Sequence, residues 1–275
     1  MKFTLFVLLA LGLAANPAVA RDQAPLYGNN AVSGKYYEIN GIRIYCETYG
    51  SGPPVLMIHG NGGSIAQFEH NIPYFAATHR VIIADSRAQG KSRDDGPSLT
   101  FEMMADDCAA LLDKLHVESA DVIGWSDGGI TALLLALRHP EKIRRLAVTG
   151  ANLRPDASAF APGIWESDNE RYQRDKHKVW STEKEKNDWK LFMLDRLEPN
   201  IPSSALRAIQ TPSLIICGDH DAISLEHTIE IYRSLPHAAL WVVPNSPHET
   251  LIAHADDFNR TVDAFFNAAT LINPK

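Results

Sequence analysis

The chain has 275 residues, of which 45% are hydrophobic and 21% are charged, an ordinary composition for a globular protein. This length supports one large hydrophobic core and does not require two domains. The formal net charge is −7 and no cluster of basic residues stands out, which argues against nucleic acid as a partner.

The first predicted element is a secretory signal peptide over residues 1–20. It has a basic residue near its start, an apolar stretch over residues 3–15 and the small-residue sequence Ala-Val-Ala at its end, which is the pattern of a segment cleaved during export. A membrane anchor is the alternative, but the apolar stretch is shorter than the about 20 residues that a spanning helix needs. Cleavage after Ala20 would leave a periplasmic or secreted domain over residues 21–275 with no stable membrane anchor.

Eight apolar segments predict strands. The sequence KYYEINGIRIYCETYG predicts two strands joined at Asn40-Gly41, because Asn-Gly is the strongest short signal for a hairpin. Continuous apolar runs of the kind found in strands covered on both faces predict six more. These runs lie at residues 54–60, 80–87, 120–125, 143–150, 213–218 and 239–244.

Helical patterns lie between these strands, at Ala66–Thr78, Phe101–Leu115, Gly129–Arg138, Leu225–Leu235 and Glu249–Asn267. Strands that alternate with helices indicate an α/β protein with a mostly parallel sheet. The right-handed crossover rule then places helices on both faces of the sheet. We therefore expect an α/β fold with a mostly parallel sheet of about eight strands between two layers of helices.

One segment interrupts the alternation. Residues 152–210 contain no clear strand, and they hold a charged sequence with sparse apolar residues at helical spacing. A structureless loop of this length would be unusual inside a compact domain. We expect a small helical cap inserted at this point, and the alternative is a long surface excursion with no role in substrate choice.

Three cysteines, Cys46, Cys108 and Cys217, all lie inside apolar segments. An odd number in an exported protein is not the pattern of a disulfide framework. Buried free thiols are therefore the expectation.

The sequence GWSDGG, residues 124–129, predicts a nucleophile. It matches the pattern Gly-x-Ser-x-Gly and lies between a predicted strand and a predicted helix, where the serine of such a turn is strained and exposed at the carboxyl end of the sheet. A serine hydroxyl is a weak nucleophile and needs a base to accept its proton. We assign Ser126 as the nucleophile, and the alternative is an ordinary turn between a strand and a helix.

The sequence HGNGG, residues 59–63, follows the strand at 54–58 and predicts part of an oxyanion hole. Glycines let the backbone approach a substrate oxygen and turn an amide toward it. The expected donors are the backbone N–H groups of Asn61 and Asp127, and a flexible glycine turn is the alternative. His59 itself is expected to hold the loop by hydrogen bonds.

The base and its orienting acid are predicted in the loops after the last two strands. His248 lies in a loop at the start of a helix, whereas His254 lies two turns into that helix, where a packed or solvated histidine is the usual interpretation. Asp219 and Asp221 are the two candidates for the acid. We choose Asp221 because it lies further into its loop and can reach across to His248.

With these residues in place, the chain resembles the serine α/β-hydrolases from about residue 36 to its end. HGNGG, GWSDGG, GDHD and PHETL all occur at the places expected for that family, in its order Ser, Asp, His. The sequence DSRAQGKS, residues 85–92, resembles the family's D-x-R-G-x-G-x-S loop, with Ala88 where glycine is usual. The resemblance implies a small-molecule substrate and a catalytic triad of Ser126, Asp221 and His248.

Locally, residues 124–152 are similar to the same region of the biphenyl-hydrolase-like proteins, which include valacyclovir hydrolase. Those proteins act on esters of α-amino acids, and the aspartate after their serine pairs with the substrate amino group. Asp127 occupies this position here. The resemblance thus implies a substrate-binding role for its side chain, and the alternative is an acid that only stabilises the N-terminus of its helix.

We expect a carboxylic-ester hydrolase that works through an acyl-enzyme. One alternative keeps the same triad for lactones, amides or peptides, carbon–carbon bonds or perhydrolysis, and another is a non-catalytic binding protein on the same fold. An aspartate nucleophile, as in haloalkane dehalogenases and epoxide hydrolases, is disfavoured because the position holds Ser126. The sequence shows neither metal-ligand spacing nor a dinucleotide fingerprint, so no metal or other cofactor is expected.

Overall fold

The computed structural model describes residues 26–268, and the predicted signal peptide at residues 1–20 lies outside them. Eight strands form one sheet in the order β1-β2-β4-β3-β5-β6-β7-β8. Strand β2 is antiparallel to both of its neighbours and the other pairs are parallel, so the predicted fold class is confirmed. The bounds are β1 Gly34–Ile39, β2 Ile42–Tyr49, β3 Pro54–Ile58, β4 Arg80–Ala84, β5 Ala120–Trp125, β6 Ile143–Thr149, β7 Ser213–Gly218 and β8 Ala238–Val243.

Strands β1 and β2 form the predicted hairpin. Asn40 and Gly41 have φ angles of 44° and 82°, and a two-residue turn with both central residues at positive φ matches the twist of antiparallel strands. Ile39 pairs with Ile42 across this turn. The sequence signal therefore identified both the turn and the register.

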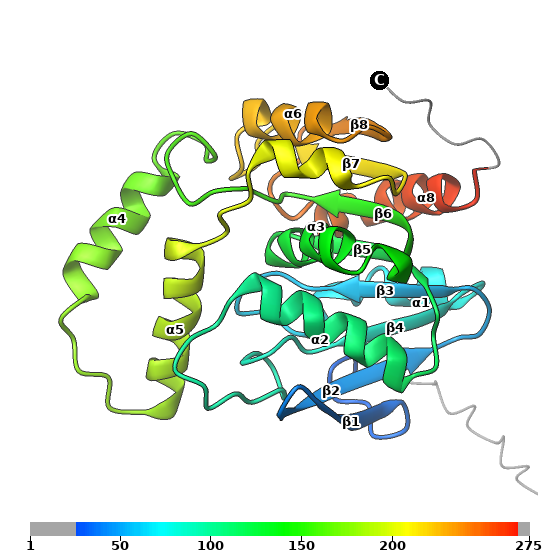
Figure 1. Cartoon of the computed structure of the whole chain (residues 1–275), viewed down its shortest axis with the longest axis horizontal. Coiled ribbons are helices and arrows are strands. Elements are labelled where there is room, and N and C mark those ends of the chain that lie inside the picture. Colours follow the sequence, from blue (N-terminus) through cyan, green and yellow to red (C-terminus); the bar gives the residue numbers. More distant parts are fainter. Residues whose placement is uncertain (1–25, 269–275) are drawn as a thin grey trace, which may run out of the picture.

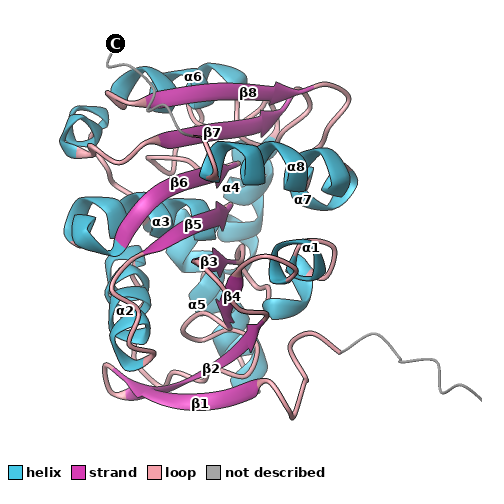
Figure 2. Cartoon of the chain, turned by 90° about the vertical axis from the view of Figure 1, so that its right-hand side faces the viewer, coloured by secondary structure: helices cyan, strands magenta, loops and turns pink. Residues whose placement is uncertain are grey.

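Helices cover both faces of the sheet (Figure 2). One face carries α2 (Phe101–Lys114), α3 (Asp127–Arg138) and α6 (Leu225–Ser234), and the other carries α1 (Ile72–Ala76), α7 (Thr250–Ala253) and α8 (Ala255–Phe266). Side chains of a strand alternate between the two faces. In β3, Leu56 therefore packs into the core under α2 and α3, whereas Met57 packs into the core under α1 and α8.

Two predicted helices are each divided in the structure. The segment predicted as Ala66–Thr78 forms a short 3-10 helix, η1 (Ile65–Phe68), followed by α1, which has Pro73 in its first turn. Proline has no N–H and clashes with the preceding turn, so it starts a new helix instead of continuing one. The predicted helix 249–267 is divided at His254, whose ψ of 41° is not helical.

The segment between β6 and β7 contains α4 (Ile164–Asp175), α5 (Glu183–Leu197) and a 3-10 helix, η3 (Ser203–Ala208). Helix α5 starts at a capping box, in which Thr182 accepts from the N–H of Glu185 and the Glu185 carboxylate accepts from the N–H of Thr182. Aromatic contacts join the two helices, since the rings of Tyr172 and Trp189 stack with centroids 6.3 Å apart. Figure 1 shows α4 and α5 beside the carboxyl ends of the parallel strands, where α/β sheets bind ligands.

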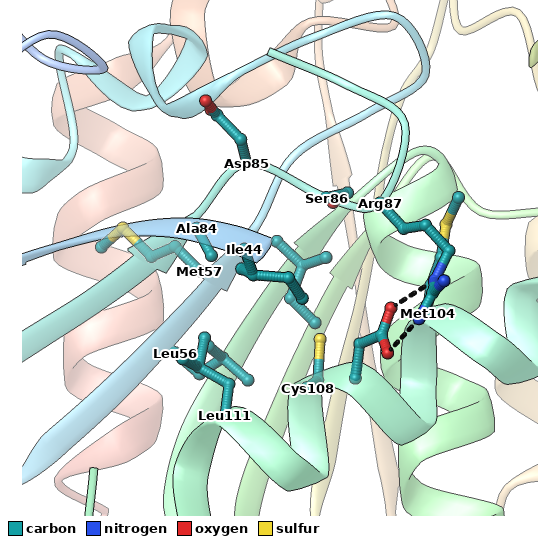
Figure 3. Close-up of a pocket in the computed structure, with 12 residues that line it drawn as sticks. Ile44, Leu56, Met57, Ala84, Asp85, Ser86, Arg87, Met104, Cys108 and Leu111 are labelled. Atoms are coloured by element: carbon teal, nitrogen blue, oxygen red, sulfur yellow. Dashed lines mark hydrogen bonds and ion pairs between the residues drawn. The ribbon is translucent and has the colours of Figure 1, made fainter. Parts of the chain in front are cut away.

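A small cavity lies between β3, β4 and α2 (Figure 3). Its volume is about 20 Å³, which is room for about one water molecule. The buried ion pair of Arg87 and Asp107 closes one side, with N–O distances of 2.7 Å. This cavity is therefore too small for an organic substrate.

The three cysteines are free thiols in the structure, as predicted, and Cys46 and Cys217 are buried. Burial raises the pKa of the Cys46 thiol to about 12 and that of Cys217 to about 11, so both remain protonated and unreactive at neutral pH. Within residues 26–268, none of the helices combines the length and the apolar character that crossing a bilayer requires.

Candidate active site

Ser126 lies on a strained turn between β5 and α3. Its φ and ψ angles are 56° and −121°, a region that residues other than glycine rarely adopt. Two glycines make this turn possible. A Cβ on Gly124 would lie 2.2 Å from the carbonyl oxygen of Gly128, and one on Gly128 would lie 2.0 Å from that of Ile58. The Gly-x-Ser-x-Gly spacing therefore follows from the close approach of the helix start to β5 and β3.

His248 contacts both Ser126 and Asp221. It lies in the loop between β8 and α7, and its Nε2 is 2.9 Å from the Oγ of Ser126. Its Nδ1 is 2.6 Å from the Oδ1 of Asp221. The structure thus brings together the three side chains that the sequence analysis selected as nucleophile, base and acid.

Asp221, and not Asp219, is the acid that faces His248. Its side chain is only 1% exposed, and its Oδ1 also accepts a hydrogen bond from the N–H of Ile223 at 3.0 Å. Asp219 instead accepts from the N–H of Ser246 at 3.0 Å. The first carboxylate orients the histidine, whereas the second holds the turn after β8.

The environment of His248 favours its protonated form. Burial lowers the pKa of His248, but the hydrogen bond and the charge of Asp221 outweigh burial and raise the pKa above its ordinary value.

The loop of His248 is held by Trp125, whose Nε1–H donates to the carbonyl oxygen of His248 at 3.1 Å. Gly150 leaves room for the ring, because a Cβ there would lie 2.7 Å from the Cε1 of His248. Neither supporting role was identified from the sequence, since Trp125 occupies a variable position of the Gly-x-Ser-x-Gly pattern and Gly150 belongs to no motif.

Asn61 and Asp127, the two expected oxyanion donors, are joined through their side chains. Asp127 is the first residue of α3, so its N–H is one of those that a helix leaves without an internal acceptor. The Nδ2 of Asn61 donates to the Oδ2 of Asp127 at 2.9 Å and to the carbonyl oxygen of Leu191 at 3.3 Å. The loop after β3, the start of α3 and helix α5 therefore meet at Asn61.

A second carboxyl group, from Asp195 of α5, lies on the same cavity as Asn61 and interacts with the carboxyl group of Asp127. Burial raises the pKa of Asp127 to about 6. Burial, followed by the charge of Asp127, raises the pKa of Asp195 well above its ordinary value. Asp195 was not identified from the sequence, because it belongs to no motif and lies in a segment with many other charged residues.

The other two histidines considered do not face Ser126. His59 is buried, and its Nδ1 donates to the carbonyl oxygen of Gly60 at 2.8 Å while its Nε2 accepts from the N–H of Ser86 at 2.9 Å. It joins two loops, as expected. His254 lies between α7 and α8, where its Nε2 donates to the carbonyl oxygen of Asn245 at 3.2 Å.

Asp85 holds the loop that resembles the family's D-x-R-G-x-G-x-S sequence. Its two carboxylate oxygens accept from the N–H groups of Ile65 at 2.9 Å and Lys91 at 2.7 Å. Ala88, where glycine is usual, has a φ of 63°, which costs an alanine about 1–2 kcal/mol. The loop therefore keeps the left-handed conformation in spite of the substitution.

A cavity of about 220 Å³ lies between α4, α5 and the loop of Asn61. Its walls include Asp168 and Arg171 from α4 and Asp195 and Arg196 from α5. These side chains give the space beside the loop a polar character. Among the described residues, no group of three or more histidines, cysteines and acids is arranged to hold a metal ion.

Comparisons with known proteins agree with the fold. The pattern of the α/β-hydrolase fold family matches residues 53–179. Serine hydrolase BPHL of Mus musculus is 29% identical over 262 residues, which cover 86% of this chain and 87% of the relative. Pimeloyl-[acyl-carrier protein] methyl ester esterase of Chromobacterium violaceum is 30% identical over 80% of this chain and 97% of its own length. A meta-cleavage product hydrolase from Pseudomonas fluorescens superposes with a TM-score of 0.68 at 23% identity, covering 88% of this chain and all of that chain.

Proposed function

Because the chain belongs to the α/β-hydrolase family, we propose that it hydrolyses carboxylic esters of small molecules through an acyl-enzyme on Ser126. The observation that carries this proposal is the continuous contact from Ser126 Oγ through His248 to the buried Asp221. A base within hydrogen-bond reach of the hydroxyl, itself oriented by a carboxylate, is what an activated serine needs. The strained turn between β5 and α3 presents the hydroxyl at the carboxyl end of the sheet.

The reaction follows from this geometry. Ser126 Oγ attacks the ester carbonyl carbon as His248 Nε2 takes the hydroxyl proton, and Asp221 stabilises the imidazolium that forms. The tetrahedral oxyanion receives hydrogen bonds from the backbone N–H groups of Asn61 and Asp127. His248 gives its proton to the departing alcohol, which leaves an acyl group on Ser126. Water, activated by His248, then releases the carboxylic acid and restores the serine.

A fluorophosphonate probe tests whether the serine is activated. It forms a covalent bond to an activated serine and should label the wild-type protein at Ser126, but not Ser126→Ala. Peptide mass spectrometry locates the labelled residue. A protein that takes up no probe would be the non-catalytic binding protein that the fold also permits.

The bond that is cleaved is tested with a panel of substrates. The same triad serves lactones, amides, peptides, carbon–carbon bonds and perhydrolysis, and relatives of this chain include esterases and a semialdehyde hydrolase by name. We expect p-nitrophenyl esters of varied acyl length to be cleaved faster than a homoserine lactone or an anilide. Faster turnover of the lactone or the anilide would replace the ester assignment and leave the triad in place.

Recognition of an amino group is a second candidate property of the site, favoured by the buried carboxyl of Asp127 beside Ser126. Loss of one partner of a buried charged pair costs about 2–5 kcal/mol. Asp127→Ala should therefore lower kcat/KM for amino-acid esters at least about tenfold more than for simple acyl esters. Its backbone N–H remains, so the ratio isolates the side chain.

The pH dependence supplies a control for this prediction. Since the pKa of Asp127 is raised to about 6, the carboxylate is present above that pH and is lost as the pH falls through it. The preference of the wild-type protein for amino-acid esters should shrink below about pH 6. Equal losses on both ester classes in Asp127→Ala would end the amino-ester assignment and leave substrate choice to residues 152–210.

We also propose that the enzyme acts after export, as a periplasmic or secreted protein without residues 1–20, and that α4 and α5 form its cap. The support is the pattern of the first 20 residues and the position of both helices beside the active site (Figure 1). The mass of the protein recovered outside the cytoplasm should correspond to a chain that starts at Arg21. An intact Met1 in a membrane fraction would contradict cleavage.

A further inference from the structure

The contact between Asp127 and Asp195 joins the serine turn to the cap. Asp127 follows Ser126 directly and is 5% exposed, whereas Asp195 lies in the last turns of α5 and lines the 220 Å³ cavity. Asn61 lies between them, since its Nδ2 donates to Asp127 at 2.9 Å and to the carbonyl oxygen of Leu191, one turn before Asp195, at 3.3 Å. Asn61 and Asp195 also line the same cavity, and the carboxyl groups of Asp127 and Asp195 are close enough to interact with each other.

Two carboxyl groups form a hydrogen bond only when one of them carries a proton. Two buried carboxylates in contact would repel each other, so such a pair holds one proton and the remaining negative charge. The Nδ2 of Asn61 donates to the Oδ2 of Asp127 at 2.9 Å, which stabilises the negative charge on Asp127. The proton is therefore assigned to Asp195, which donates to Asp127.

The residues linked in this way are the ones that carry the oxyanion donors. The backbone N–H groups of Asn61 and Asp127 would receive the oxyanion, and the side chains of the same two residues are bonded to each other. The Asn61 side chain also reaches the carbonyl oxygen of Leu191 in α5. A protonated Asp195 thus closes a network of three side chains behind both donors.

We propose that Asp195 is a positioning residue for the hydrolysis. Its hydrogen bond to Asp127 holds the backbone N–H groups of Asn61 and Asp127 in the positions that the oxyanion needs, so that the rate of hydrolysis depends on how α5 is seated. This inference rests on the proposed function, because it needs the oxyanion to form at these donors. Asp195 acts on the reaction through Asp127 and Asn61, and not by contact with the reacting serine.

Other charged groups surround the pair and set its behaviour with pH. His248 lies close enough to Asp127 to interact with its charge, and Asp168 interacts with Asp195 from α4. Arg171 and Arg196 lie on the wall of the same cavity. At acidic pH, protonation of His248 removes the base. At alkaline pH, loss of the shared proton leaves two carboxylates that repel each other.

Substitution of Asp195 should change kcat and leave KM nearly unaltered. A displacement of about 1 Å at the reacting groups can cost about 10²-fold in rate, so Asp195→Ala should lower kcat for a p-nitrophenyl ester about 10- to 100-fold. Asp195→Asn can still donate to Asp127 through its amide, and it should keep kcat within about threefold of the wild-type value at neutral pH.

The matched control is Asp188→Asn. Asp188 lies on the same helix and the same cavity, but it pairs with Lys184 at 2.5 Å and is 49% exposed. It should leave kcat unchanged. A kcat for Asp195→Ala equal to that of Asp188→Asn would overturn the inference, as would equal losses in Asp195→Ala and Asp195→Asn.

The pH profile provides a readout that a purely structural role would not move. The wild-type kcat should decline at alkaline pH as the shared proton is lost, whereas Asp195→Asn has no proton to lose and should show no such decline. An alkaline decline that persists unchanged in Asp195→Asn would contradict the inference. This comparison stands even if Asp195→Ala fails to fold.

Labelling by the fluorophosphonate probe separates this inference from the proposed function. If wild-type Ser126 takes up no probe, the proposed function fails. If the wild-type protein and Asp195→Ala are labelled at Ser126 with the same rate constant, the proposed function stands and the role of Asp195 is refuted. Labelling of Asp195→Ala that is slower by about the same factor as its kcat supports both.

Discussion

Ser126→Ala and His248→Ala should each lower kcat by about 10⁵- to 10⁶-fold, and the double variant should be little worse than either single one. The nucleophile and its base act as a unit, so the loss of either removes the same step. His248 Nε2 lies 2.9 Å from Ser126 Oγ, and either change ends that proton transfer. The kcat of each single variant and of the double variant is measured with a p-nitrophenyl ester, on purified protein whose folding has been verified.

His254→Ala is the matched control for His248→Ala. Its imidazole lies on the same segment of chain, but it bonds only to the carbonyl oxygen of Asn245 among the hydrogen bonds described. Its kcat should stay close to the wild-type value. A kcat for Ser126→Ala close to the wild-type value would show that Ser126 is not the nucleophile. Additive losses in the double variant would show that Ser126 and His248 do not act in the same step.

Asp221→Asn should lower kcat by about 10⁴-fold, because an amide at this position favours the wrong tautomer of the histidine. The present carboxylate accepts from Nδ1 at 2.6 Å and leaves Nε2 free to take the serine proton. Its hydrogen bond and charge also raise the pKa of His248 against the effect of burial. Once the charge is gone, burial dominates and the pKa of His248 should fall.

The pH dependence of kcat/KM checks this second effect. The acidic limb reports the pKa of the free base, so the residual activity of Asp221→Asn should begin at lower pH than that of the wild-type protein. Asp219→Asn is the control, since Asp219 bonds the backbone of Ser246 and does not face the histidine. A harsher loss in Asp219→Asn than in Asp221→Asn would show that the acid had been misassigned.

The strands and the turns were predictable from the sequence because their causes are local. Continuous apolar runs are required wherever a strand is covered on both faces, and the turn at Asn40-Gly41 needs two residues that accept positive φ. Ser126 was recognisable from the local Gly-x-Ser-x-Gly spacing, although the steric limit at Gly128 is imposed by Ile58 of β3 and only that at Gly124 is local. The division of the two predicted helices was harder to see in the sequence, since only the break before α1 is marked by a residue, Pro73.

Partners across the fold depended on tertiary structure. Asp219 and Asp221 differ by two positions in one loop, and the closing of that loop against the segment of His248 decides which carboxylate reaches the imidazole. Trp125 and Gly150 support His248 from β5 and from the end of β6, which no periodicity could reveal. Asp221 was the choice from the sequence, and packing places its carboxylate, and not that of Asp219, against the imidazole.

Asp195 shows the limit most clearly. It lies near the end of a segment rich in charged residues, and an acid in such a helix-forming segment is usually solvated. Only the folding of α5 over the start of α3 half-buries this one carboxyl group and brings it near Asp127. The sequence by itself determined the strands and the turn that holds the serine, because apolar runs and the chemistry of a tight turn are local patterns. The tertiary structure decided which distant carboxyl and amide groups meet behind the serine, because that depends on how two loops and a cap helix converge.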